Sequence, residues 1–137
     1  MNTAASAPAR EARPRLTIIG WIIRAAVAFV FISTGLEKFS IGGGAEWIRI
    51  FHRIGYGDWF RYLTGALEIG GGLLLIIPPL TTVGAAALIA CMVGAIFFHI
   101  FALGDPFSSI INIGLTLAIL AAAREPKAED LTTLSLS

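Results

Sequence analysis

Four long apolar segments limit what this chain can fold into. They cover residues 16–39, about 59–77, about 80–103 and about 107–123. Each approaches the roughly 20 residues that a helix needs to cross a bilayer. Because lipid cannot pair the polar groups of the backbone, segments of this kind span a membrane as helices. The sequence therefore predicts an all-α fold with one domain, residues 16–123, that forms a four-helix transmembrane bundle.

The composition supports a membrane location. Hydrophobic residues make up 56% of the chain and charged residues 14%, whereas a soluble domain carries about 25% charged residues. The first apolar segment is longer than the roughly 7–15 apolar residues of a secretory signal, which indicates a retained helix. The formal net charge of +1 gives no indication of nucleic-acid binding. We expect the lipid bilayer as the main partner.

The two ends of the chain are predicted to lie outside the bundle. Residues 1–15 are small, proline-containing and basic, which is typical of a disordered tail, and residues 124–137 form a polar C-terminal tail. Lys and Arg residues near the ends of the membrane segments favour the cytoplasmic side. With the N-terminus in the cytoplasm, five such residues lie on that side and four on the other, so the counts barely discriminate. The orientation is instead assigned from the basic residues that precede the first segment, Arg10, Arg13 and Arg15. Both termini are therefore expected in the cytoplasm.

The long connection after the first segment contains an amphipathic stretch, AEWIRIFHRI, at residues 45–54. Its apolar residues Trp47, Ile50, Phe51 and Ile54 recur at helical spacing. The charged residues Glu46, Arg49 and Arg53 fall on the opposite side. This pattern predicts a short helix lying in the membrane interface, with a partly ordered loop as the alternative.

Acidic residues stand where two of the later helices begin. Asp58 precedes the second segment, and Asp105 followed by Pro106 precedes the fourth. Aspartate is a favoured N-cap, and proline is favoured at the first helical position. We therefore expect both aspartates to cap helices. The glycines at positions 70–72 indicate close packing of the second helix against a neighbour.

Charged residues within the apolar segments point to a polar interior. Arg24, Ala28, Phe31, Gly35 and Lys38 fall on one stripe of the first helix. Arg24 lies about 12 Å from the start of its segment, and Glu68 about 13–14 Å from the end of the second. An unpaired charge in a membrane costs about 2.5–3.5 kcal/mol. The sequence therefore predicts a buried Arg24–Glu68 ion pair, either fixing helix register or relaying charge.

Polar and aromatic residues gather near the outer ends of the predicted helices. The candidate pocket consists of Lys38, Arg61, Tyr62, His99 and Asn112. Such a pocket could hydrogen-bond the carbonyl of a quinone, while aromatic rings hold the quinone ring. A histidine there could also relay a proton near neutral pH. The alternative is that Lys38 and Arg61 reach toward lipid headgroups and that His99 bonds a backbone carbonyl.

Other cofactor chemistries lack the residues they need. The single cysteine, Cys91, excludes a CxxC redox pair. No metal-ligand spacing is found, and no second helical histidine faces His99 to hold a haem. The glycines at 42–44 lack the lysine of a phosphate-binding loop. We therefore expect no metal and no covalently bound cofactor, with a quinone as the candidate ligand.

The membrane segments also resemble a known family. Arg24, TGLEKF at residues 34–39, GALEIGGGLLL at residues 65–75 and a third helix ending near His99 are similar to the DoxX family of small bacterial membrane proteins. The resemblance implies a four-helix bundle in the bacterial inner membrane. The family takes its name from a subunit associated with a terminal quinol oxidase and thiosulfate:quinone oxidoreduction. The positions that match the family pattern are Arg24, Gly35, Lys38, Phe39, Glu68 and Gly71.

Three functions remain open from the sequence. The leading hypothesis is an accessory component of a redox or respiratory membrane assembly, with protein partners and quinone-linked chemistry. The second is an oxidoreductase subunit that binds quinone at Lys38, His99 and Asn112 itself. The third is a small proton-coupled transporter, which internal repeats would favour. The two halves of the chain show no convincing similarity.

Overall fold

The computed structural model describes residues 12–39 and 44–124, with side chains from Ile18 onward. These residues form helices joined by short turns and contain no strand, which confirms the all-α class. The α-helices are α1 (Ala12–Glu37), α2 (Ala45–Ile54), α3 (Asp58–Ile76), α4 (Thr81–Phe98) and α5 (Pro106–Arg124). A 3-10 turn, η1 (Pro78–Leu80), joins α3 to α4, and a π-helical turn, η2 (His99–Leu103), extends α4.

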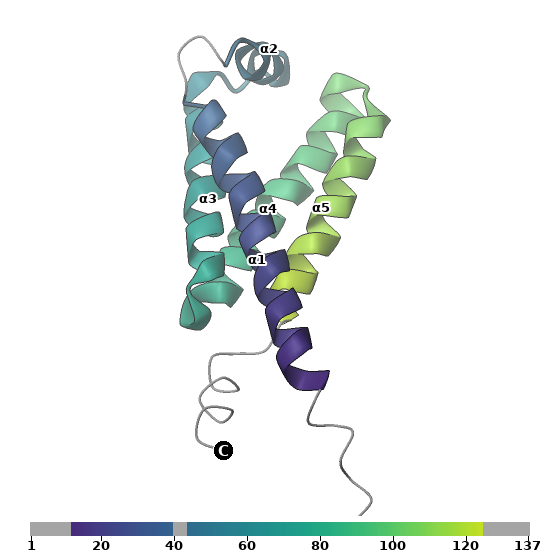
Figure 1. The fold of residues 1–137 in the computed structure, drawn as a ribbon. Helices are drawn as coiled ribbons and strands as arrows, with labels where there is room; N and C mark the ends of the chain where they lie inside the picture. Colours follow the sequence, from purple (N-terminus) through teal and green to yellow (C-terminus); the bar gives the residue numbers. More distant parts are fainter. Residues whose placement is uncertain (1–11, 40–43, 125–137) are drawn as a thin grey trace, which may run out of the picture.

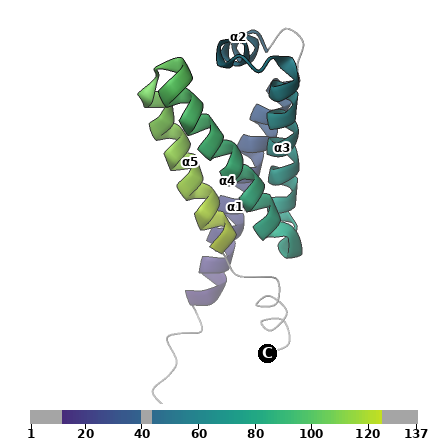
Figure 2. The ribbon, with the colours of Figure 1, turned by 180° about the vertical axis from the view of Figure 1, so that it is seen from behind.

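The four long helices form the bundle and α2 covers one end of it. In Figure 1, α1 and α3 run side by side. The pair α4 and α5 diverges from them, and the separation is widest at the end of the bundle where α2 lies. The reverse view shows the same divergence, with α2 at the open end of the bundle, beside the upper end of α3 (Figure 2). The largest fully buried side chains come from four helices: Phe31, Leu75, Leu88 and Ile119. The helices therefore pack closely at one end and separate beneath α2.

Glycines set the close contacts of α3 with its two neighbours. A Cβ atom added at Gly72 would lie 3.2 Å from the carbonyl oxygen of Ala28 on α1. One added at Gly71 would lie 3.2 Å from the carbonyl oxygen of Gly84 on α4. Small residues allow helix backbones to approach in this way. The close-packing prediction is confirmed for these two glycines, whereas Gly70 has nothing within 4 Å.

Of the two predicted helix caps, the structure confirms Asp105 and does not confirm Asp58. Asp105 caps α5, because its Oδ1 accepts the backbone N–H groups of Phe107 (3.1 Å) and Ser108 (3.3 Å). The prediction for Asp58 was wrong: Gly57 occupies the N-cap position, and Asp58 is the first residue of α3. Its carboxylate instead pairs with Arg61 at 3.1 Å. Because Asp58 stands inside the helix rather than before it, its side chain shares a face with Arg61, three residues further on.

The Asp105 cap gives a pH-dependent prediction. The side-chain and backbone hydrogen bonds from Ser108 hold the pKa of Asp105 below its ordinary value of 3.8. The stabilisation is therefore complete above about pH 3.8 and is lost as the pH falls through the lowered pKa. Asp105→Ala should lower the melting temperature at pH 7, and the difference from the wild type should shrink in acid. Asp105→Asn, which can cap without ionising, should remove the acid dependence while keeping most of the stability. An acid dependence unchanged in Asp105→Asn would contradict this assignment.

The membrane-spanning character is clear for three segments of the described chain. Ile18–Glu37, Pro78–Leu103 and Pro106–Arg124 are long and apolar enough to cross a membrane. The helix α3 is not among them, because its 19 residues include Asp58, Arg61 and Glu68. The fourth span therefore remains a prediction, as does an interfacial position for α2, which does form the expected helix.

The first helix starts earlier than the apolar segment that predicted it. The helix α1 begins at Ala12, four residues before the expected start at position 16. Alanine and arginine favour helix, and Pro14 falls in the first turn of α1, where its missing N–H costs no hydrogen bond within the helix. The rest of the predicted basic tail, residues 1–11, and the predicted C-terminal tail from residue 125 lie outside the described residues.

Candidate functional site

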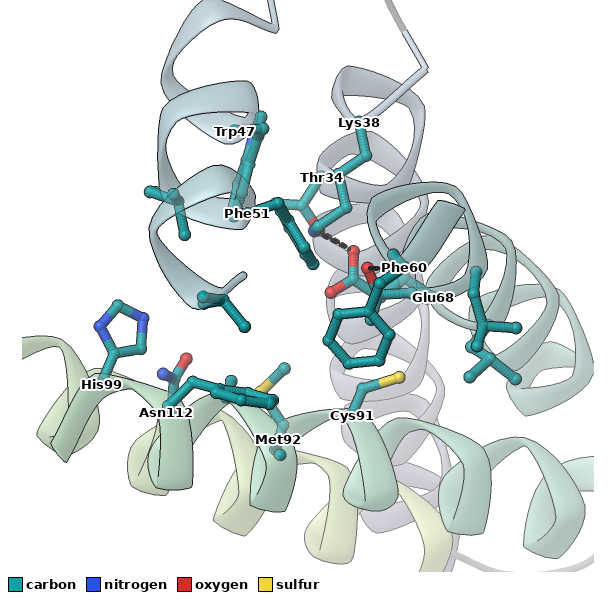
Figure 3. Close-up of a pocket in the computed structure, with 18 of the residues that line it drawn as sticks. Thr34, Lys38, Trp47, Phe51, Phe60, Glu68, Cys91, Met92, His99 and Asn112 are labelled. Carbon is teal, nitrogen blue, oxygen red and sulfur yellow. Dashed lines mark hydrogen bonds and ion pairs between the residues drawn. The ribbon is translucent and has the colours of Figure 1, made fainter. Parts of the chain in front are cut away.

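A cavity of about 270 Å³ lies between the diverging helices and beneath α2. The apolar face of α2 lines it with Trp47, Ile50, Phe51 and Ile54. Phe60 of α3 and Phe98 of α4 add further aromatic wall. Figure 3 shows α2 above the cavity, with Cys91, Met92 and Asn112 on the opposite side. The apolar face that the sequence assigned to the membrane interface therefore covers an internal cavity.

An ion pair forms the polar end of this cavity. The ammonium Nζ of Lys38 lies 2.5 Å from Oε2 of Glu68, and the two side chains are only 3% and 8% exposed. The hydroxyl of Thr34 donates to the same oxygen at 3.4 Å. The ring of Trp47 lies 3.9 Å from the Lys38 ammonium and contributes a cation–π contact. All four residues line the cavity (Figure 3).

The predicted Arg24–Glu68 pair was therefore wrong: the cation that pairs with Glu68 is Lys38. The contact between Gly72 and Ala28 sets the register of α1 and α3. Counting four residues back from Ala28 and four on from Gly72 places Arg24 opposite Ile76. That position is eight residues beyond Glu68, or roughly 12 Å along the helix. The sequence estimate aligned the ends of two apolar segments, whereas α1 begins earlier and glycine contacts decide the register.

Arg24 instead connects α1 to the end of α5. Its Nε and Nη2 donate to the carbonyl oxygen of Ala122 at 3.4 and 3.2 Å. The guanidinium also lies 4.9 Å from the ring centre of Trp21. The stripe on which the sequence placed Arg24 is buried along its whole length, from Arg24 to Lys38. The predicted inner face of the first helix is thus confirmed.

The predicted outer pocket is only partly assembled. Lys38, His99 and Asn112 line the cavity, but Arg61 and Tyr62 do not. Arg61 is buried between the helices, where it pairs with Asp58 and donates to the backbone carbonyl of Lys38. The exposed ring of Tyr62 stacks on Phe39 at 5.3 Å. Arg61 therefore fixes the turn after α1, in which Lys38 stands.

His99 stands at the far end of the cavity from the ion pair (Figure 3). It is the first residue of η2, and its carbonyl accepts the N–H of Asp105 at 2.9 Å. Its Nδ1 is buried and makes no hydrogen bond to any described residue. The nearest carboxylate oxygen, Oδ2 of Asp105, lies 4.0 Å away, which is beyond hydrogen-bonding distance.

Sequence reasoning missed several residues of the cavity. Glu68 was placed in a separate ion pair, and Cys91 was considered only as half of a CxxC redox pair. Thr34, Trp47 and Phe60 were not proposed as site residues at all. The amphipathic pattern of α2 carried a usable signal, because an apolar face needs a partner surface. That partner could have been the bundle as well as the lipid.

Comparisons with known proteins give one match. A model of the DoxX-like family matches residues 22–123, a range that includes all the residues lining the cavity. No curated protein and no solved structure matches the chain.

Proposed function

Because this membrane protein belongs to the DoxX-like family, we propose that it binds a quinone in its cavity, as an accessory component of a redox or respiratory assembly. The observation that carries this proposal is the cavity itself. Its walls are largely apolar and aromatic, and a few polar groups, led by the Lys38–Glu68 pair, converge on it. Pockets of this composition are typical of small-molecule sites.

The size of the cavity suits the ring of a quinone. About 270 Å³ is close to the lower end of the roughly 300–1,000 Å³ usual for ligand pockets. The Lys38 ammonium has three N–H donors and uses one for Glu68, so it can donate to a carbonyl oxygen. Leu63 and Leu67 line the cavity and are also exposed on α3. An isoprenoid tail can leave the cavity beside them and enter the lipid.

We also propose α3 as the fourth span. Its 19 residues extend about 28 Å at 1.5 Å per residue, close to the thickness of the hydrocarbon core. Arg61 and Glu68 are buried, while Leu63, Leu67 and Leu73 face outward. The start of α1 and the end of α5 lie at the same end of the bundle (Figure 1), as four crossings require. The bacterial inner membrane with cytoplasmic termini is part of this proposal.

Cys91 provides a direct test, because the single cysteine of the chain lines the cavity. A fully substituted short-chain benzoquinone has no free ring carbon for thiol addition. At about ten times its Kd, it should slow alkylation of Cys91 by N-ethylmaleimide about tenfold, since about nine-tenths of the sites are occupied. Mass spectrometry of the intact protein in nanodiscs measures the rate.

A cysteine elsewhere provides the control. In Cys91→Ser/Gly114→Cys, the thiol stands on the exposed side of α5, away from the cavity. Its alkylation rate should not respond to the quinone. Unchanged alkylation of Cys91 at saturating quinone, or equal slowing at both positions, would contradict quinone binding in the cavity.

A further inference from the structure

A second, polar hollow of about 420 Å³ lies between α2 and the turn from η2 into α5. Three residues line both this hollow and the cavity: Ile50, His99 and Leu103. Of these three, His99 alone carries an ionisable side chain. We propose that His99 passes protons between the polar hollow and a ligand in the cavity. This inference rests on the proposed function, since it assigns a role at the same quinone site.

The local backbone sets His99 apart. A π-helical turn begins at this residue. Such turns are rare in proteins, and those that occur often lie at functional sites. The turn ends at Gly104, in the left-handed conformation with φ of +65°. The chain then folds back, so that Asp105 donates its N–H to the His99 carbonyl. This geometry holds the imidazole beside the Asp105 carboxylate and between the two spaces.

Different charged groups surround His99 in the polar hollow and in the cavity. Asp105 lies nearest, with Oδ2 at 4.0 Å from Nδ1. Its carboxylate already accepts the Ser108 hydroxyl at 2.5 Å. The other ionised groups are Glu46, Arg49 and Arg53 of α2 in the hollow, and Lys38 and Glu68 in the cavity. The hollow thus brings both signs of charge together on its polar side, and Arg49 pairs with Glu46 there.

The proton step needs no electron and no other reactant. The imidazole takes a proton from the hollow at one ring nitrogen and releases the proton of the other nitrogen to a ligand oxygen. The ring keeps its charge overall, as it exchanges one tautomer for the other. The buried Nδ1, which has no hydrogen-bond partner among the described residues, is available for the first half of this exchange.

The test uses a ligand whose colour reports its own ionisation. A hydroxynaphthoquinone with an alkyl group on the remaining quinone-ring carbon is bound to the full-length protein in nanodiscs. Protection of Cys91 from alkylation establishes that it occupies the cavity. After a pH jump in a stopped-flow instrument, the colour change of the bound probe gives the rate of proton exchange. We expect His99→Ala to slow this rate at least about tenfold, which is below the usual range for acid–base groups, and added imidazole to restore it.

Two further variants make the outcome specific. His99→Gln, which cannot carry a proton, should be slowed like His99→Ala. His52→Gln changes the other histidine, which is exposed on α2 and lines neither space, and should match the wild type. A bound probe that exchanges at the wild-type rate in both His99 variants would overturn the proton role alone. Slowing that imidazole does not relieve would also overturn it. Failure of the probe to protect Cys91 would overturn the proposed function and this inference together.

Discussion

Replacing Lys38 by methionine is expected to destabilise the protein by roughly 3–5 kcal/mol, because the change leaves the Glu68 carboxylate buried without its partner. The two groups lie 2.5 Å apart and are almost fully buried. The Thr34 hydroxyl remains, but one neutral hydrogen bond contributes only about 1 kcal/mol. Unfolding in detergent, followed by tryptophan fluorescence, measures the loss.

A double-mutant cycle separates the ion pair from the effect of size. Lys38→Met/Glu68→Leu removes both charges and should recover most of the loss, since an apolar pair of similar volume is often neutral. Arg24→Met/Glu68→Leu should be additive within about 0.5 kcal/mol, because the two residues do not touch. Coupling between Arg24 and Glu68, with none between Lys38 and Glu68, would show that the assigned register of α1 and α3 is wrong.

Gly84→Ala is expected to cost about 2–3 kcal/mol through overpacking. A Cβ atom at this position would lie 2.6 Å from the backbone nitrogen of Leu75 and 2.7 Å from the carbonyl oxygen of Gly71. Both contacts are backbone atoms of α3, so relief requires α3 and α4 to move apart. The loss should exceed the roughly 1 kcal/mol by which alanine favours a helix over glycine. Thermal unfolding in detergent is the measurement.

Gly70→Ala is the matched control on α3. A Cβ atom there would meet nothing within 4 Å, so the substitution should be neutral or stabilise by up to about 1 kcal/mol. Equal destabilisation by the two substitutions would contradict the close contact at Gly84.

The sequence predicted the helical elements better than their mutual placement. Apolar length and helical spacing identified the five α-helices of the described residues, and the buried stripe from Arg24 to Lys38 was correct. These features depend on residues close together in the chain. The ion partner of Glu68 depends on the register between α1 and α3, which a few glycine contacts decide. Segment ends are a poor guide to that register, since a helix can begin before its apolar segment, as α1 does at Ala12.

The candidate site shows the same limit. The structure brings Lys38, His99 and Asn112 to one cavity, and the sequence could group them because each stands near one end of a predicted helix. The sequence could not predict whether Arg61 faces the pocket or the helix interface, since a buried guanidinium can find hydrogen-bond acceptors in either place. The cavity exists because α4 and α5 diverge from α1 and α3 beneath α2. That divergence is a property of the whole bundle, to which no short sequence pattern corresponds.

Native mass spectrometry of the tagged protein, extracted gently from its own membranes, tests the central claim most directly. Gly94 lines the cavity and has nothing within 4 Å of an added Cβ, so Gly94→Leu should fill the cavity without disturbing the backbone. Gly114→Leu on the exposed side of α5 is its control. We predict a retained mass of quinone size on the wild type and on Gly114→Leu, and its loss from Gly94→Leu. A chain that retains no such molecule, or retains it equally in Gly94→Leu, would contradict quinone binding in the cavity.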